Sequence, residues 1–195
     1  MRICVFCGSS PGNHDVYAEQ ARKLGRAMAE RGIVLVYGGA HVGTMGAIAD
    51  AALEAGGEVV GVIPQQLVDL EVAHHDITEL HVVADMHERK AGMAARSEAF
   101  VALPGGAGTL EELFEIWTWA QLGLHAKPVG VLDVNGYYEP LQRLTEHMVG
   151  EGFLRPQHRD MLLFDDDPHA LLDRLATYEP PPNVTKWRSD TPGGR

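Results

Sequence analysis

The residues best suited to chemistry lie in one glycine-rich segment, Pro104-Gly105-Gly106-Ala107-Gly108-Thr109-Leu110-Glu111-Glu112. An apolar run over 99–103 precedes it, and a strongly helical pattern over 109–124 begins within it. A strand that ends in a glycine bend and continues as a helix points backbone N–H groups and a positive dipole end at one place, where phosphate binds. Glycine also lets the backbone approach an anion closely. Because two carboxylates follow in the predicted first helical turn, we expect a nucleotide or sugar phosphate site that performs a reaction.

The same segment has a purely structural interpretation. Thr109 and Glu112 stand at the Thr-x-x-Glu spacing of a capping box, in which Glu112 would only close a helix end. A cap needs no Gly-Gly-x-Gly ahead of it, and those glycines cost backbone entropy, so the spacing favours the phosphate site. No Gly-Lys-Ser/Thr follows and no G-x-G-x-x-G is present, which excludes a Walker A loop and a dinucleotide fingerprint.

The elements around this segment alternate between short β-branched runs and longer helical patterns. This alternation predicts an α/β fold, an open parallel sheet with helices on both faces. Ligands bind such sheets outside the carboxyl ends of the strands. Three glycine segments sit at predicted strand ends and should face one crevice, namely Gly8-Ser9-Ser10, Gly38-Gly39 and Pro104-Gly105-Gly106. The predicted strands are 2–7, 33–37, 58–63, 81–83, 99–103, 128–133 and 161–164, and the predicted helices are 15–31, 44–55, 86–96, 109–124, 136–151 and 168–177.

Composition limits the classes of partner. The chain has 195 residues, and its 16 Lys+Arg against 27 Asp+Glu give a net charge of −11, which argues against extended nucleic-acid binding. We expect one domain over 1–179 and a flexible polar tail over 180–195. The absence of a long apolar span and of a signal peptide predicts a cytoplasmic protein with no membrane partner.

Cysteine and histidine provide no metal set. Cys4 and Cys7 form a C-x-x-C spacing, but residues i and i+3 of a strand point to opposite faces, so we expect two buried, reduced thiols. His87-Glu88 is not followed by x-x-His, so the metalloprotease motif fails. The sequence therefore predicts no catalytic metal.

Taken together, these segments resemble the LONELY GUY (LOG) family of cytokinin-activating phosphoribohydrolases over about residues 2–178. The family hallmark P-G-G-x-G-T-x-x-E is matched in full by 104–112, and Asp85-Met86-His87-Glu88-Arg89-Lys90 resembles its second motif. The 4–10, 37–46 and 117–123 segments are also typical of the family.

The resemblance implies a Rossmann-like fold, a homodimer, no cofactor, and hydrolysis of the N-glycosidic bond of an N6-modified AMP to a free cytokinin base and ribose 5-phosphate. It implies Arg89 and Glu112 as the catalytic pair. The implied substrate contacts are Glu71, Lys90, Gly105, Gly106, Ala107, Gly108, Thr109, Leu110, Glu111 and Thr118. The Glu71 surroundings, Asp69-Leu70-Glu71-Val72, depart from the family pattern, in which a Pro and a Leu flank this acid more regularly.

The chemistry of the catalytic pair agrees with this reaction. Breaking a glycosidic bond builds positive charge on the ribose, and a fixed carboxylate such as Glu112 stabilises it. The dipole at the helix start would favour the ionised form of that carboxylate. Glu112 could equally hold ribose hydroxyls or orient the attacking water. Arg89 stays protonated, so we assign it positioning and charge stabilisation.

Two alternatives remain. Relatives carry a lysine decarboxylase label, which requires pyridoxal phosphate and a Schiff-base lysine; the candidates are Lys23, Lys90, Lys127 and Lys186. The other alternative is a nucleotide-binding or molybdenum-cofactor carrier protein on the same fold without turnover. A carrier has no use for the acid, which favours the enzyme.

Overall fold

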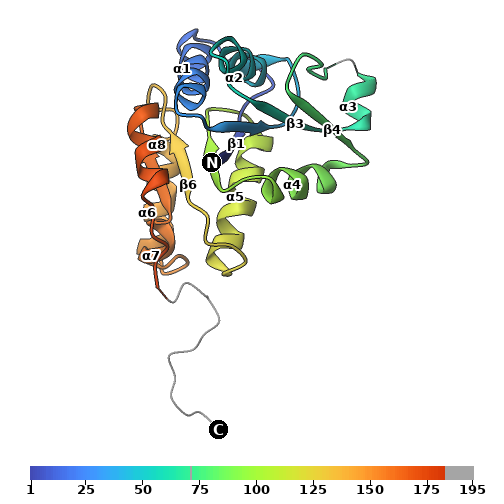
Figure 1. Cartoon of the computed structure of the whole chain (residues 1–195). Helices are drawn as coiled ribbons and strands as arrows, with labels where there is room; N and C mark the ends of the chain where they lie inside the picture. The colour runs from blue at the N-terminus through green and yellow to red at the C-terminus, as the bar shows by residue number, and fades with distance from the viewer. Residues whose placement is uncertain (71, 183–195) are drawn as a thin grey trace.

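The fold is a seven-stranded parallel sheet with helices on both faces, as predicted (Figure 1). A computed structural model describes residues 1–70 and 72–182; the tail predicted over 180–195 lies mostly outside these residues. The strands are β1 (Arg2–Phe6), β2 (Val34–Tyr37), β3 (Val59–Pro64), β4 (Glu79–Val83), β5 (Ala99–Ala102), β6 (Val129–Leu132) and β7 (Leu162–Asp165), in the order β4-β3-β2-β1-β5-β6-β7.

The helices agree with the sequence pattern except at two short elements and at the bounds of two longer ones. The helix expected over 109–124 ends at Gln121, and the helix expected over 136–151 begins at Glu139. The short α3 and α7 were not predicted, because four or five residues carry too little periodicity to identify. The long helix expected from Thr109 begins two residues earlier. The helices are α1 (Val16–Glu30), α2 (Gly43–Glu54), α3 (Gln65–Asp69), α4 (Met86–Ala95), α5 (Ala107–Gln121), α6 (Glu139–Gly150), α7 (Pro156–Arg159) and α8 (Pro168–Ala176).

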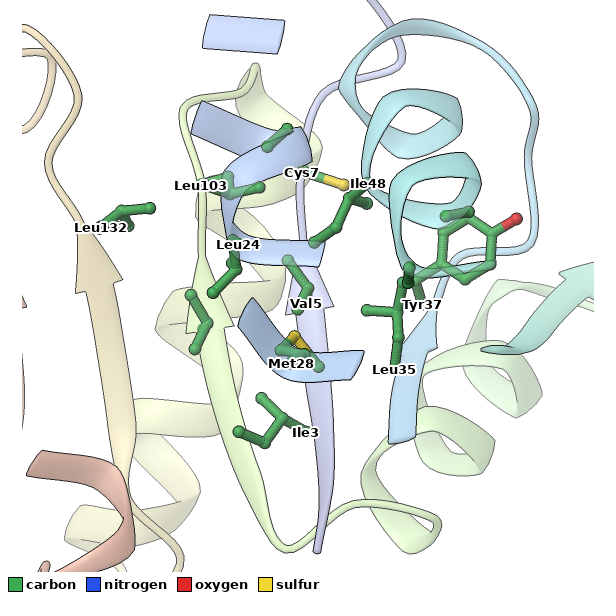
Figure 2. Close-up of a cluster of buried hydrophobic side chains, with 14 of the residues drawn as sticks. Ile3, Val5, Cys7, Leu24, Met28, Leu35, Tyr37, Ile48, Leu103 and Leu132 are labelled. Carbon is green, nitrogen blue, oxygen red and sulfur yellow. The ribbon is translucent and has the colours of Figure 1, made fainter. Parts of the chain in front are cut away.

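Apolar side chains on each face of the sheet form a separate core. On one face, α1, α2 and α8 cover the cluster drawn in part in Figure 2, where Leu24 and Met28 of α1 lie over Val5 of the central strand. On the other face, α4, α5 and α6 bury Met93, Trp117 and neighbouring residues. Burial on both sides explains why the central strands are continuous apolar runs.

The two cysteines follow this division. Cys4 lies in the core under α5, and Cys7 lies in the core under α1 and α2, so the two thiols occupy opposite faces and are free, as predicted. Among residues 1–70 and 72–182, no group of His, Cys, Asp and Glu side chains is arranged to hold a metal ion, and no helix is long and apolar enough to cross a membrane.

The strand order creates a binding position at the centre of the sheet. From β1 the chain moves outward through β2, β3 and β4, and β5 then returns to pair with the other side of β1. The loops after β1 and β5 therefore diverge from a common point, which is the crevice where open α/β sheets bind ligands. Gly8-Ser9 follows β1 and Gly105-Gly106 follows β5, so two of the three glycine segments meet at this switch point.

Candidate active site

A cavity of about 460 Å³ opens at the carboxyl ends of β1, β2 and β5. Segments far apart in sequence converge on it. Of the three glycine segments expected to face one crevice, those after β1 and β5 contribute Gly8, Ser9 and Gly106, whereas Gly38 and Gly39 do not line the cavity and the following Ala40 does. The lining residues are Cys7, Gly8, Ser9, Ala40, Val42, Met45, Leu67, Val72, Met86, Arg89, Gly106, Ala107, Gly108, Thr109, Glu111 and Glu112.

The start of α5 provides the anion-binding end of this cavity. Its N-cap is Gly106, and no side chain caps it. Across the described part of the chain, the N–H groups of Gly106, Ala107 and Gly108 have no hydrogen-bond partner. The capping box that Thr109 and Glu112 could have formed is therefore absent. We call these three N–H groups the phosphate cradle, because unpaired amides at a helix start are suited to binding phosphate.

Glycines allow the loops around the cradle to touch. A Cβ on Gly43, whose φ is +60°, would overlap the backbone of Ser9, and a Cβ on Gly8 would lie 3.4 Å from the Cα of Gly105. The buried Thr44 fastens this contact, since its hydroxyl accepts a hydrogen bond from Gly8 N at 3.0 Å and donates one to Gly8 O at 3.1 Å. The cradle thus rests on a close-packed backbone rather than on flexible side chains.

Arg89 enters the cavity from α4. Asp85 caps this helix by accepting hydrogen bonds from the N–H groups of His87 and Glu88, and Glu88 in turn accepts one from Ala84 N. Although Arg89 is 8% exposed, its guanidinium is well partnered. Nε donates to Val62 O at 3.3 Å and Nη2 donates to Gly38 O at 3.4 Å. Val62 lies within β3 and Gly38 directly follows β2, and their two carbonyls fix the guanidinium in place.

Glu112 lies opposite, with Oε1 3.5 Å from Nη1 of Arg89 and 8% of the residue exposed. Burial raises the pKa of its carboxyl above the ordinary value, and the Arg89 charge opposes that rise. The expected dipole stabilisation was overestimated, because α5 begins at Ala107 and both Glu111 and Glu112 lie beyond its first turn. An ionised carboxylate at this place therefore depends mainly on Arg89.

Cys7 also reaches the cavity. Burial raises the pKa of its thiol to about 12, so it stays protonated and is a poor nucleophile. Five apolar residues that were not predicted as site residues line one wall of the cavity: Cys7, Val42, Leu67, Val72 and Met86. Val42 and Met86 lie in segments typical of the family, but the wall was not predicted, because its members come from α3, α4 and separate loops and meet only in the fold.

The structure brings together most of the predicted site residues, but not all of them. Arg89, Glu112, Glu111 and the 106–109 segment line the cavity, whereas Gly105 lines a smaller neighbouring one. Lys90 points its amine at Glu111 and Glu115, with Nζ–O distances of 2.6 and 3.1 Å. The remaining three are not placed at the cavity. Leu110 packs against the core that α4, α5 and α6 cover, and Thr118 is exposed on α5. Glu71 lies outside the described residues.

The position of Arg89 can be tested without changing Arg89. A Cβ on Gly38 would overlap the end of the Arg89 guanidinium, while the φ of Gly38 lies outside the left-handed region. We expect Gly38→Ala to displace the guanidinium and lower kcat/KM by about 10- to 100-fold, the range for small misplacements of a catalytic group. Steady-state kinetics and thermal unfolding would be compared with Gly150→Ala, where an added Cβ meets nothing within 4 Å. Wild-type kinetics in Gly38→Ala would contradict the importance of this placement.

Comparison with known proteins places this site in a family. A family model described as "Possible lysine decarboxylase" matches residues 45–175. The probable cytokinin riboside 5'-monophosphate phosphoribohydrolase LOGL1 of Oryza sativa subsp. japonica is 50% identical over 177 residues, which cover 91% of this chain and 79% of the relative. The cytokinin riboside 5'-monophosphate phosphoribohydrolase LOG7 of Arabidopsis thaliana is 50% identical over 179 residues, 92% of this chain and 82% of the relative.

Solved structures with the same fold are more distant in sequence. The molybdenum cofactor binding protein of Rippkaea orientalis matches with a TM-score of 0.68 and 21% identity over 90% of this chain and 94% of that one. The molybdenum cofactor carrier protein of Chlamydomonas reinhardtii matches with a TM-score of 0.68 and 20% identity over 91% and 98%. At such identities the likeness shows the fold alone, whereas half-identical relatives that match nearly the whole described chain show descent. The chain therefore belongs to the LONELY GUY family of cytokinin riboside 5'-monophosphate phosphoribohydrolases.

Proposed function

We propose that this protein hydrolyses the N-glycosidic bond of an N6-modified AMP, releasing the free base and ribose 5-phosphate. The observation that carries this proposal is the buried Arg89–Glu112 pair, 3.5 Å apart, in the same cavity as the unpaired amides of α5. Family members that are half identical over most of the chain are named for this reaction.

The spacing along α5 suits a nucleotide. From Ala107 to Glu112 the helix rises about 7.5 Å, at 1.5 Å per residue. A phosphate on the cradle would therefore place the anomeric carbon of its ribose near the Glu112 carboxylate, since a ribose 5-phosphate unit has a comparable span. We assign the apolar wall of Val42, Leu67, Val72 and Met86 to the base and its N6 substituent.

In the reaction, the C1'–N9 bond breaks with its electron pair going to the purine, and a water oxygen bonds to C1'. The ionised Glu112 carboxylate stabilises the positive charge that develops on the ribose. Arg89 holds that carboxylate ionised and places a fixed cation beside it. Water gives one proton to solvent or to a nearby base, and the departing purine takes one up.

The residues do not suit a pyridoxal phosphate enzyme, although the family model carries that label. Such an enzyme needs a free lysine in the cavity. None of the three described lysines lines it: Lys23 pairs with Asp167, Lys90 with Glu111 and Glu115, and Lys127 donates to Ala94 O. Lys186 lies outside the described residues.

Several finer assignments stay predictions. Substrate contacts by Glu71, Lys90, Leu110 and Thr118, the homodimer, the single domain over 1–179 and the cytoplasmic location rest on the sequence and the resemblance. Lys90 could contact the substrate only by sharing its amine with Glu111, because the two are already hydrogen-bonded. This hydrogen bond also raises the pKa of the Lys90 amine.

The proposal is tested by incubating purified protein with N6-isopentenyl-AMP, AMP and the unphosphorylated isopentenyl riboside, and separating the products by chromatography. We expect free isopentenyladenine and ribose 5-phosphate from the modified nucleotide, and no base from the riboside. Equal release from AMP would broaden the substrate to purine monophosphates in general. Bound nucleotide without base release would contradict the hydrolase and favour a carrier.

A further inference from the structure

A tyrosine outside the catalytic cavity is bonded to the backbone of the glycine-rich turn. The Tyr137 hydroxyl donates a hydrogen bond to the carbonyl oxygen of Gly105 at 2.5 Å, across 32 residues of sequence. Tyr137 lines a second cavity of about 290 Å³, which Gly105 and Gly106 also line. Only Gly106 of these two lines the catalytic cavity.

Local sequence explains how Tyr137 is held there. Asn135 and Gly136 have φ values of 54° and 71°, and Tyr137 N donates to Val134 O at 3.1 Å, which is the pattern of a type I′ turn. The ring makes edge contacts with Tyr17 and Tyr138, at centroid distances of 5.9 and 5.1 Å. These contacts restrict the ring, so the hydroxyl is aimed at one carbonyl.

The adjacent Tyr138 secures the same turn one step earlier. Its hydroxyl donates to Leu103 O at 2.7 Å, and its own N–H donates to Asp133 Oδ1 at 2.7 Å. Tyr138 is buried, whereas Tyr137 is 40% exposed. Two consecutive tyrosines after β6 thus bond to two carbonyls that follow β5. Only the more exposed Tyr137 bonds to the Gly105–Gly106 peptide, whose N–H belongs to the cradle.

The hydrogen bond from Tyr137 to the Gly105 carbonyl also sets the direction of the Gly106 N–H. The Gly105 carbonyl and the Gly106 N–H belong to one planar peptide, and in a trans peptide the two groups point in opposite directions. The carbonyl held by Tyr137 therefore fixes the opposite direction of the Gly106 N–H, and Gly106 lines the catalytic cavity, whereas Tyr137 does not. Glycine on both sides of this peptide would otherwise permit it to rotate.

We infer that Tyr137 is a positioning residue: its hydrogen bond to Gly105 fixes the Gly105–Gly106 peptide and so aims the Gly106 N–H at the substrate phosphate. The inference rests on the proposed use of the cradle for phosphate. It concerns affinity for the phosphate group and not the chemistry at Glu112, so its loss should appear in binding and in KM rather than in kcat.

The test compares wild type, Tyr137→Phe and Tyr178→Phe by calorimetric titration with ribose 5-phosphate and, separately, with adenine. Tyr178→Phe removes the same hydroxyl from a residue that lines neither cavity. We expect Tyr137→Phe to weaken ribose 5-phosphate binding about fivefold, the effect of one hydrogen bond, with adenine binding and Tm unchanged. In turnover, KM for the nucleotide should rise by a similar factor while kcat is kept.

Unchanged affinity for ribose 5-phosphate in Tyr137→Phe would overturn the inference. Equal weakening of adenine binding together with a lower Tm would also overturn it, because that pattern indicates general disruption of the loop. Titration needs no turnover, so the two proposals fail separately: a wild type that binds ribose 5-phosphate but releases no base contradicts the hydrolase and leaves the role of Tyr137 to be decided by the same titrations.

Discussion

Replacement of Glu112 by glutamine should lower kcat by at least ~100-fold, the lower range for losing such a catalytic group. Glutamine keeps the size and one oxygen of the side chain but removes the negative charge. That charge lies 3.5 Å from Arg89 in a site where Glu112 is 8% exposed, so little water is present to replace it. Stabilising ribose charge, orienting water and accepting its proton all require the ionised carboxylate, and all three are lost together.

This experiment separates chemistry from binding. Because the cradle amides belong to the backbone, Glu112→Gln should keep its affinity for ribose 5-phosphate within a few fold, while kcat falls. Glu139→Gln makes the same change at an exposed glutamate of α6 and should match wild type. Near-normal turnover by Glu112→Gln, with the fold confirmed by circular dichroism, would reduce Glu112 to a structural partner of Arg89.

The sequence predicts the architecture well because its signals are local. The inner strands of the parallel sheet are buried on both faces and appear as apolar runs. Glycine marks the loops that must approach one another, such as those of Gly8 and Gly105. The opposite burial of Cys4 and Cys7 follows from strand geometry alone. The Pro156 at the start of α7 is a usable signal for a helix, but four residues are too few for a periodic pattern.

The start of α5 shows where local rules fail. Thr109 and Glu112 satisfy the capping-box spacing, yet the helix begins at Ala107 behind an uncapped glycine. A side-chain cap would occupy the amides that the proposed function assigns to phosphate, so the proposal accounts for the departure from the preferred cap. Helix-capping preferences alone cannot predict an uncapped start of α5, since they take no account of a ligand.

Contacts between distant segments could not be predicted from local pattern. Resemblance names Arg89 and Glu112, but their ion pair, and the carbonyls of Val62 and Gly38 that hold Arg89, depend on how α4 and α5 cross the strand ends. The hydrogen bond from Tyr137 to Gly105 likewise joins segments that are far apart in sequence. Asn135-Gly136 in the sequence signals a turn, but nothing local indicates which carbonyl the following tyrosine will reach.

Replacement of Arg89 by alanine should lower kcat/KM by at least ~100-fold, which corresponds to about 3 kcal/mol of lost transition-state stabilisation at 1.4 kcal/mol per factor of ten. The change removes the cation beside the reacting bond and leaves the Glu112 carboxylate buried without its partner. Arg89→Lys keeps the charge but lacks the planar fork that contacts Val62 O, Gly38 O and Glu112 at once, so we expect an intermediate loss. The exposed Arg143→Ala serves as the control.

The pH dependence identifies how Arg89 acts. Burial raises the pKa of Glu112 and Arg89 opposes that rise, so alanine at position 89 should raise this pKa further. Activity needs ionised Glu112 and is lost as pH falls through its pKa, so the acid limb of the kcat/KM profile should move to higher pH in Arg89→Ala. A carboxyl whose pKa is raised by folding favours the folded state when protonated, below its unfolded pKa, and this contribution is lost as pH rises through the folded value.

The stability of Arg89→Ala should therefore approach that of wild type in acid and fall behind it as pH rises, in thermal unfolding measured across the same buffers. An acid limb that stays in place while kcat/KM falls would assign Arg89 to the substrate alone and not to the ionisation of Glu112. A shifted limb with a parallel, pH-dependent loss of stability would instead establish one electrostatic unit, in which α4 supplies the cation that keeps the carboxylate of α5 ionised in a buried site. These two outcomes distinguish an arginine that only binds substrate from one that also keeps the catalytic carboxylate of Glu112 ionised.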